Sequence, residues 1–401
     1  MISDTARRRT LLRFSAAEFL FFAFGSLLSY QTVFLKDTLG LSSAEIGSLT
    51  AGCAVISLAF IPLWGVLSDK LRSARVVFGL CMAGAAAATL LFSFLGAGLP
   101  AAPALIFLLL LLKYLFQQPT NSLLDGWAIS ELAPHGVTYS RVRVWGSVGF
   151  AFFCLLLGLT VGKVLSVRTA FRLCAALGLA LAAWTFAQRG GAASGGEAKP
   201  GLRDFLRLLK NKKFLMYLLF SIGPNIFVGV TLVYFPYVLE LAGVSTDRIG
   251  IFTGLRSGIE VLTMLVLLTL LSQRVSAGYL VALPGLFGGL EHLLYGSAPG
   301  MAPIFVSMTL SGLAGGVFYG MGPAYIHSIV PAALQNTAQT LAAFVTTLVA
   351  VGGSFLGGRL ISRFGILALT RGCGAVMLAL SALFLLSQAL WRTPFFPGKK
   401  A

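Results

Sequence analysis

The sequence predicts an all-α membrane protein with twelve transmembrane helices, arranged as two pseudo-symmetric six-helix bundles. Three observations predict this fold class. First, 57% of the 401 residues are hydrophobic and 11% are charged, against roughly 25% charged residues in soluble domains, and the mean hydropathy is +0.89. Second, apolar runs of about 20 residues, the length that crosses a ~30 Å hydrocarbon core, recur along the chain. Third, one long polar interval divides these runs into two halves.

The first half of the chain contains six apolar runs that are long enough for membrane-spanning helices. The first run is full length and no small-residue cleavage pattern follows it, so we expect it to remain as a helix rather than act as a removed signal peptide. Pro119 lies inside the fourth run, where we expect it to bend the helix. The predicted spans are 12–35, 43–68, 74–97, 101–130, 141–163 and 168–187.

A polar segment separates the two halves. It is rich in Gly, Ser and basic residues, as linkers are, and its end has the pattern of a short basic amphipathic helix. We therefore predict an N-terminal bundle over residues 1–188, a cytoplasmic linker over 189–213 and a C-terminal bundle over 214–401. The predicted spans of the second bundle are 214–238, 248–272, 277–296, 302–326, 337–358 and 365–390.

An internal repeat supports the division into two halves. GLSSAEIGSLTAG begins at Gly40 and GVSTDRIGIFTGL begins at Gly243, and Gly, Ser, Ile, Gly and Thr coincide at one constant offset. Each copy covers the turn after the first helix of a half and the start of the second helix. Two parallel six-helix repeats are typical of transporters, in which the halves rock about a site near the bilayer midplane.

The net charge of +17 is distributed as in an inner-membrane protein rather than a nucleic-acid-binding protein. With the N-terminus inside, most of the 30 Lys and Arg residues fall in cytoplasmic segments, among them residues 7–9 and the linker. The positive-inside rule then places both termini of this multi-pass plasma (inner) membrane protein in the cytoplasm. Arg359, Arg363 and Arg371 fall on the outer side and depart from the rule.

The five cysteines stand singly in apolar surroundings, and none has the spacing of metal ligands. We interpret them as small packing residues. We expect no metal site and no cofactor. The cysteines are Cys53, Cys81, Cys154, Cys174 and Cys373.

The stretch PLWGVLSDKLRSAR contains Gly65, Asp69, Lys70 and Arg72. It resembles the Gly-x-x-x-Asp-Lys/Arg signature between the second and third helices of the major facilitator superfamily, with Arg72 in place of the signature's later glycine. The resemblance implies that Gly65 allows close helix approach and that Asp69, Lys70 and Arg72 form a cytoplasmic gate. The alternative is a loop whose positive charges only set the orientation.

The start of the fifth run, RVRVWGSVGFA at residues 141–151, resembles the lactose permease and phenylpropionate permease group of this superfamily. The resemblance covers the N-terminal half and becomes patchy after the linker. It implies a transporter with the twelve-helix fold. The sequence shows no nucleophile constellation, metal cluster, phosphate-binding glycine loop or soluble catalytic domain, so we do not expect an enzyme.

Several charged side chains fall within the predicted spans, and we single out seven of them. Each costs about 2.5–3.5 kcal/mol at the centre of a helix in lipid, so seven would together cost roughly 20 kcal/mol. We therefore expect them to face one another or water. They are Glu18, Lys113, Asp125, Arg143, Arg256, Glu260 and Glu291.

A polar stripe marks the fourth helix. Lys113, Gln117, Asn121 and Asp125 recur every four residues and share one broad face. We expect this face to line a hydrated cavity, so Gln117, Asn121 and Asp125 are candidate solute-binding residues.

Asp125 and Arg143 stand on consecutive helices across a short turn, which can bring them to a similar depth. A carboxylate and a guanidinium can each form hydrogen bonds with vicinal hydroxyls of a sugar. In lactose permease the matching acid and arginine bind sugar, so the resemblance implies this role here. Phe150 falls where lactose permease has a tryptophan that stacks on the sugar ring. The alternative is an ion pair that only joins two helices.

Two acids of the second half are further candidates. The resemblance implies that Glu260, in SGIEVL, matches a sugar-binding glutamate of the lactose permease group, while Arg256 one turn earlier is placed to neutralise it. Glu291 lies in apolar surroundings that favour a protonated carboxyl, so it is a candidate proton carrier together with Glu260 and Glu18. We interpret the neighbouring His292 as an interfacial or internally hydrogen-bonded histidine.

The resemblance fails on helix ten. Ser311 and Ala314 stand where lactose permease has a histidine and a coupling carboxylate, and Glu291 stands in place of its helix-nine arginine. Proton coupling therefore has either moved to Glu291, Glu260 or Glu18, or been lost, which would leave facilitated diffusion or exchange.

We expect a monomeric secondary active transporter in the lipid bilayer that carries a sugar- or oligosaccharide-like hydroxylated solute together with protons by alternating access. One alternative is an exporter of amphipathic drugs or metabolites, which would have a larger and more aromatic cavity with fewer paired charges. Another is a nucleoside or aromatic-acid permease.

Overall fold

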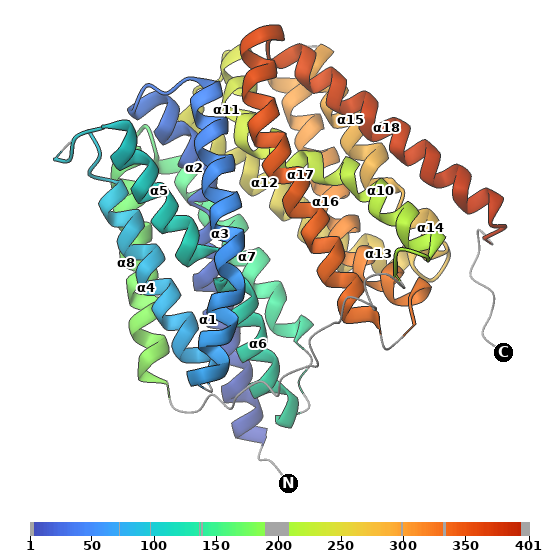
Figure 1. Cartoon of the computed structure of the whole chain (residues 1–401), viewed down its shortest axis with the longest axis horizontal. Coiled ribbons are helices and arrows are strands. Elements are labelled where there is room, and N and C mark those ends of the chain that lie inside the picture. Colours follow the sequence, from blue (N-terminus) through green and yellow to red (C-terminus); the bar gives the residue numbers. More distant parts are fainter. Residues whose placement is uncertain are drawn as a thin grey trace. The chain divides into compact units, whose positions relative to one another are not determined.

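The computed structural model describes residues 4–71, 73–96, 98–135, 137, 139–188, 208–297, 300–331 and 334–393. In this part of the chain the regular secondary structure is helical (Figure 1). Twelve segments are long and apolar enough to cross a membrane, and each overlaps one predicted span. The predicted fold class is therefore confirmed.

The chain divides into two compact units. The first contains Met1–Ala198 and Asp247–Gly254, and the second contains Lys199–Thr246 and Leu255–Ala401. Figure 1 draws the helices of the first unit mainly in blue to green and those of the second mainly in yellow-green to red. Most of the predicted linker, residues 189–207, with its amphipathic helix, lies outside the described residues.

In the first unit, α1 packs on α7, and α4 packs on both α5 and α8. The helices are α1 (Asp4–Gly25), α2 (Leu28–Val33), the π-helical η1 (Phe34–Thr38), α3 (Ser43–Leu71), α4 (Ala74–Phe92), α5 (Pro103–Gln117), α6 (Thr120–Leu132), the 3₁₀-helical η2 (Ala133–His135), α7 (Ser140–Thr160) and α8 (Val167–Ala187).

In the second unit, α15 packs on α16 and α18, and α10 packs on α17 and α18. The helices are α10 (Lys212–Ile226), the π-helical η3 (Phe227–Thr231), α11 (Leu232–Leu241), the 3₁₀-helical η4 (Thr246–Arg248), α12 (Ile249–Leu262), the π-helical η5 (Thr263–Leu267), α13 (Leu268–Leu271), α14 (Ala277–Leu280), α15 (Leu283–Ser297), α16 (Met301–Ile329), α17 (Gln335–Phe364) and α18 (Ile366–Leu390). Part of η4 and the first turns of α12 belong to the first unit.

The two repeat copies begin with the same backbone turn. Gly40 and Gly243 both have left-handed φ angles, +73° and +69°, a conformation that glycine adopts without steric cost. After Gly40, the carboxylate of Glu45 accepts hydrogen bonds from the Ser42 backbone and hydroxyl, while the Ser42 hydroxyl accepts from the Glu45 N–H. This reciprocal pattern is a capping box, which starts α3.

Several spans are interrupted within the membrane. The span over Pro103–Leu132 breaks between α5 and α6 at Gln118 and Pro119, because proline has no N–H for the helical ladder. The interruption lies at Pro119, where the sequence predicts a bend. Three other spans contain the π-helical turns η1, η3 and η5, which the sequence analysis did not predict.

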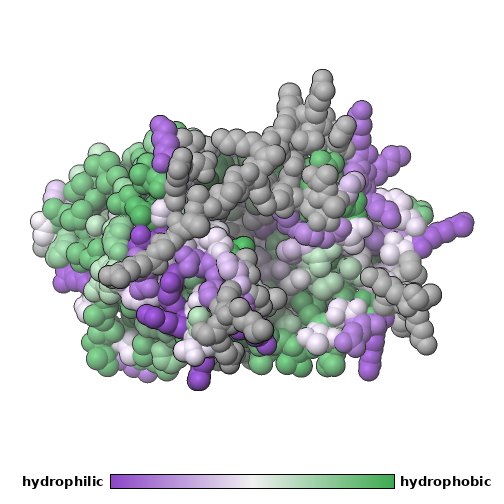
Figure 2. Space-filling model, turned by 90° about the horizontal axis from the view of Figure 1, so that it is seen from below, coloured by the Kyte–Doolittle hydropathy of each residue, from purple (hydrophilic) through white to green (hydrophobic). Residues whose placement is uncertain are grey.

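Large apolar side chains cover much of the surface of the helices, as they do in proteins whose outer helix faces contact lipid. Leu12, Leu262 and Leu348 are more than half exposed. Figure 2 shows hydrophobic residues over much of the described surface, with groups of hydrophilic residues among them. All five cysteines are buried with free thiols, as packing residues are.

Candidate functional site

The polar site of the first unit is built where α1 and α7 approach closely. A Cβ on Gly149 would lie 2.4 Å from the backbone oxygen of Phe19, and one on Gly146 would lie 2.6 Å from the ring of Phe22. Only glycine fits at these contacts. The WGSVG sequence therefore lets α7 lie against α1 and brings Arg143 over the ring of Phe22, with the guanidinium carbon 4.2 Å from its centroid.

Tyr139 joins the two candidate acids of this unit. Its hydroxyl oxygen lies 2.5 Å from Asp125 Oδ1 and 3.1 Å from Glu18 Oε1. Asn121 Nδ2 donates to the other carboxylate oxygen of Asp125, at 3.1 Å. Three predicted site residues, Glu18, Asn121 and Asp125, therefore meet around one tyrosine that the sequence analysis did not predict.

The Tyr139 hydroxyl serves as a neutral hydrogen-bonding group. Burial raises the pKa of Tyr139 above its ordinary range. The phenol therefore keeps its proton at physiological pH.

Arg143 lies within electrostatic reach of Glu18 and Asp125. Among the described side chains, however, it forms an ion pair with neither acid and stacks on Phe22 instead. The simple helix-joining ion pair between Asp125 and Arg143 is thus not formed. A guanidinium on an aromatic ring keeps its N–H donors available for a ligand.

Phe150 and Gln117 lie apart from this cluster. Phe150 is half-buried on α7, seven residues after Arg143 and hence on the same helix face about 10 Å further along. Gln117 ends α5, and its backbone oxygen accepts a hydrogen bond from the Thr120 hydroxyl.

Lys113, the first residue of the predicted stripe, points into the helix packing. It is 2% exposed, and its ammonium donates to Gln31 Oε1 at 2.6 Å. The amide of Gln31 in turn donates to the hydroxyl of Tyr114. The break at Pro119 therefore separates a buried polar contact on α5 from the Asp125 cluster on α6.

The predicted cytoplasmic gate is only partly described. Gly65 and Asp69 belong to α3, but the burial of Gly65 and the side chain of Asp69 are not described, and Arg72 is not described at all. Lys70 is exposed near the end of α3. The gate remains a prediction.

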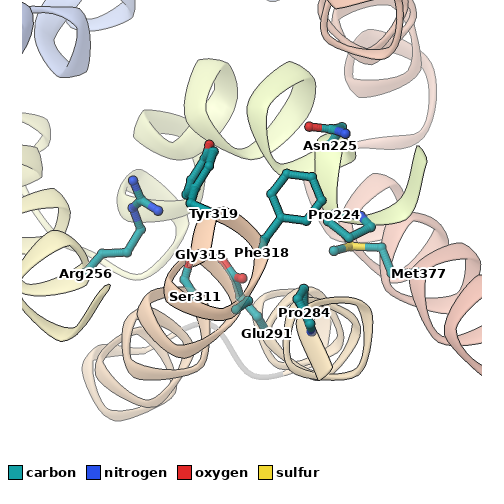
Figure 3. Close-up of a pocket in the computed structure, with 12 residues that line it drawn as sticks. Pro224, Asn225, Arg256, Pro284, Glu291, Ser311, Gly315, Phe318, Tyr319 and Met377 are labelled. Carbon is teal, nitrogen blue, oxygen red and sulfur yellow. The ribbon is translucent and has the colours of Figure 1, made fainter. Parts of the chain in front are cut away.

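The second unit contains a pocket with about 390 Å³ of space outside the protein atoms, part of it open to solvent. Figure 3 shows the Glu291 carboxylate beside Ser311 and Gly315, with Arg256 on one side and Asn225 on the other. The lining residues are Pro224, Asn225, Arg256, Pro284, Gly288, Glu291, Ser311, Ala314, Gly315, Phe318, Tyr319 and Met377.

Glu291 is the acid among the lining residues, and it is 1% exposed. The hydroxyls of Ser311 and Tyr295 lie within hydrogen-bonding reach of its carboxylate, and the charge of Arg256 acts on it. Oε1 has no hydrogen-bond partner in the described part of the chain. Glu291, Ser311 and Ala314 thus line one pocket.

Glu260 lies just behind this pocket. Its Oε2 pairs with Arg256 at 3.1 Å, so the neutralising ion pair is confirmed. A Cβ on Gly315 would lie 2.7 Å from Glu260 Oε2 and 3.3 Å from Arg256 Nη1. Glycine at this position therefore leaves room for the ion pair at the pocket wall.

His292 is buried and has hydrogen-bond partners on both ring nitrogens. Nδ1 bonds to the Gly288 carbonyl, so it carries the proton, and Nε2 accepts from the Thr231 hydroxyl in η3. The interpretation of an internally hydrogen-bonded histidine is confirmed.

Known proteins resemble the chain along most of its length. The model of the family described as MFS_1 like family matches residues 11–370. The chain belongs to this family. As a member of the major facilitator superfamily it is a multi-pass membrane transporter with twelve spans and not an enzyme.

Two relatives share about a quarter of their residues with this MFS_1-like chain. The maltose permease of Geobacillus stearothermophilus is 27% identical over 354 residues, 86% of each chain. The uncharacterized transporter YwbF of Bacillus subtilis (strain 168) is 24% identical over 335 residues, 82% of this chain and 80% of that protein.

Solved structures share the fold. The nucleoside transporter NupG matches with a TM-score of 0.77 and 20% identity over 94% of this chain and 98% of that chain. A bacterial homologue of the human lysosomal transporter Spinster, in an inward-facing and unoccupied conformation, matches with a TM-score of 0.66 and 14% identity over 97% of both chains.

Proposed function

We propose that this transporter is a proton-coupled symporter of a sugar-like hydroxylated solute, with Asp125 and Arg143 as its principal solute-binding pair. The observation that carries the proposal is the arrangement of this pair. Both side chains lie at one polar cluster but are not bonded to each other, so each retains capacity for solute hydroxyls. An ion pair that only joined two helices would have used this capacity.

Further observations support the same solute class. Asn121 belongs to the cluster, and Phe150 lies on the helix face of Arg143, where an aromatic ring can stack on a sugar. Glu260 and Gln117 are additional candidates for contacts with a longer solute. The name of the Geobacillus relative, maltose permease, is consistent with a sugar.

The proton site belongs to the same proposal. Glu18 and Glu291 are buried acids, each with one carboxylate oxygen that lacks a hydrogen-bond partner among the described residues. Glu260 is the weaker candidate because Arg256 neutralises it. The proposal also includes solute uptake with protons, monomeric function in the plasma membrane and cytoplasmic termini. The proposed cytoplasmic gate consists of Gly65, Asp69, Lys70 and Arg72.

A nucleoside is the second candidate solute. Phe318 and Tyr319 line the pocket of the second unit, where they are placed to stack on a base, while Asn225 and Glu291 offer hydrogen bonds to its edge. The structurally similar NupG is a nucleoside transporter, which is consistent with this solute.

Uptake into proteoliposomes tests the proposal. The purified protein is reconstituted and offered maltose, uridine, phenylpropionate or a cationic amphipathic dye, with and without an inward proton gradient. We expect accumulation of maltose that requires the gradient. Accumulation of uridine alone would select the nucleoside permease, and accumulation of phenylpropionate alone would select an aromatic-acid permease. Transport of the dye alone would contradict a hydroxylated solute.

Substitutions at the binding pair test the site. Asp125→Asn and Arg143→Lys are expected to reduce uptake at least tenfold, because the first removes the carboxylate and the second removes the planar fork of donors. Arg141→Lys is the matched control, since Arg141 is exposed two residues before Arg143. Normal uptake by both site variants would disprove this assignment, and it would leave the solute class to the uptake panel.

A further inference from the structure

The contacts of Tyr139 fix where protons lie in the first unit. Glu18 Oε1, the Tyr139 hydroxyl and Asp125 Oδ1 stand in a row, with separations of 3.1 and 2.5 Å. Both separations are hydrogen-bond distances. Each hydrogen bond needs one proton, and the phenol supplies only one. One of the two carboxyl groups must therefore supply the second proton.

The partners of Asp125 identify the group that carries this proton. Asn121 donates to Asp125 Oδ2, the Tyr139 hydroxyl lies within hydrogen-bond distance of Asp125 Oδ1, and Glu18 Oε2 has no hydrogen-bond partner in the described part of the chain. Asp125 thus has a donor beside each of its oxygens, as an ionised carboxylate requires, whereas Glu18 does not. The second proton then belongs to Glu18, which donates to the phenol oxygen.

The surroundings of Glu18 agree with a neutral acid. Its side chain is 0% exposed, and its Oε2 has no hydrogen-bond partner in the described part of the chain. A buried carboxylate without paired charge is costly, and protonation removes that cost.

The guanidinium of Arg143 is not bonded to Glu18. The charges that act on Glu18 are those of Arg143 on α7 and Asp125 on α6, and among the described residues α8 adds none. Yet the guanidinium rests on Phe22, one helical turn after Glu18, rather than on either acid. With Glu18 neutral, the single charges of Asp125 and Arg143 balance each other.

We propose that Glu18 is the proton-binding residue of this transporter and that the Tyr139 hydroxyl links its protonation to the solute-binding carboxylate of Asp125. The proposal rests on the proposed symport and deepens it by naming the proton site and a positioning residue. Loss of the Glu18 proton leaves two carboxylates and one phenol proton. The Tyr139 hydroxyl then donates to one of the acids, and the excess negative charge attracts the Arg143 guanidinium away from the Phe22 ring. Protonation of Glu18 thus prepares Asp125 and Arg143 for the solute, which is the order that symport requires.

Infrared difference spectroscopy during a pH titration tests the proton assignment without any solute. A protonated carboxylic acid has its own carbonyl-stretch band, and its frequency depends on the hydrogen bonds of the acid. We expect that one band of the wild-type protein is missing in Glu18→Gln. The same band should remain in Asp125→Asn and Tyr139→Phe at a shifted frequency, because the chain of hydrogen bonds is altered. Tyr114→Phe is the matched control, since the hydroxyl of Tyr114 contacts Gln31 and no acid, and the band should keep its frequency.

Two results would overturn the proposal. Loss of the band in Asp125→Asn with its retention in Glu18→Gln would place the proton on Asp125. An unshifted band in Tyr139→Phe would remove the link through the phenol. Thermal unfolding of each variant in detergent verifies that it is folded. Because the spectra require no transport, they separate a wrong proton site from a wrong solute class.

Discussion

At the scale of single residues, Lys113 shows that a residue of a polar helix stripe can contribute to helix packing instead of lining a cavity. It shares the spacing of Gln117, Asn121 and Asp125, yet its ammonium is buried against Gln31 rather than facing a cavity. Helical periodicity predicts the face of a residue, but not which neighbouring helix covers that face. The partner on α2 could not be predicted from the spacing on α5.

The contact between Lys113 and Gln31 leads to a stability prediction. Gln31→Leu removes the acceptor of a buried ammonium and should lower the free energy of unfolding by about 1–3 kcal/mol. Lys113→Met removes the charge itself and should cost less, because the apolar side chain needs no acceptor. Thermal unfolding in detergent measures both, and the double variant should recover most of the loss seen in Gln31→Leu. A lower melting temperature for Lys113→Met than for Gln31→Leu would contradict this account.

The cluster around Glu18 was partly predictable. The cost of charge in lipid predicted that Glu18, Asp125 and Arg143 would face inward, and all three lie in one cluster of the first unit. Tyr139 was missed because it lies in the short turn before α7, where no periodic pattern indicates a direction. The stacking of Arg143 on Phe22 depends on a side-chain conformation that the sequence does not reveal.

At the scale of elements, the pair of α1 and α7 depends on two small residues. Gly146 and Gly149 let the α7 backbone contact α1 at Phe19 and Phe22, and this contact places Arg143 and Tyr139 opposite Glu18. The twelve spans and the break at Pro119 were predictable, because apolar length and proline each leave a direct signal. The π-helical turns were not, since one extra residue in a helical turn leaves no comparable signal.

Gly149→Ala should destabilise the first unit. Its Cβ would meet backbone atoms of Phe19, which cannot rotate away as a side chain can, so we expect a loss of about 1–3 kcal/mol. Gly372→Ala on α18 is the matched control, because an added Cβ there meets nothing within 4 Å. The control should be neutral or stabilising by about 0.5–1 kcal/mol. Equal melting temperatures for Gly149→Ala and wild type would refute the close backbone contact.

At the scale of the whole molecule, the orientation in the membrane is open to direct measurement. Arg8 is exposed near the start of α1, and Val164 is 80% exposed between α7 and α8. An odd number of spans separates the two positions, so they lie on opposite sides of the membrane. The five native cysteines are buried and should not react with a water-soluble thiol reagent.

We expect an impermeant maleimide to label Val164→Cys in intact cells and Arg8→Cys only in inverted membrane vesicles. This pattern would place the N-terminus in the cytoplasm, as the positive-inside rule predicts. The unmodified protein is the control and should stay unlabelled in both preparations. The reverse pattern would contradict the predicted orientation, and labelling of both positions from one side would contradict the number of spans between them.

The π-helical turns determine where this chain can lose a single residue without disturbing its helices. Such a turn holds one residue more than an α-helical turn, so it stores a single-residue insertion within an unbroken helix. Deleting one residue from Phe34–Thr38, Phe227–Thr231 or Thr263–Leu267 would leave an ordinary α-helix, with the side chains on either side still on their present faces. The same deletion in a regular helix would rotate everything beyond it by about 100°. Natural variants that are one residue shorter in these spans are therefore expected at these three segments.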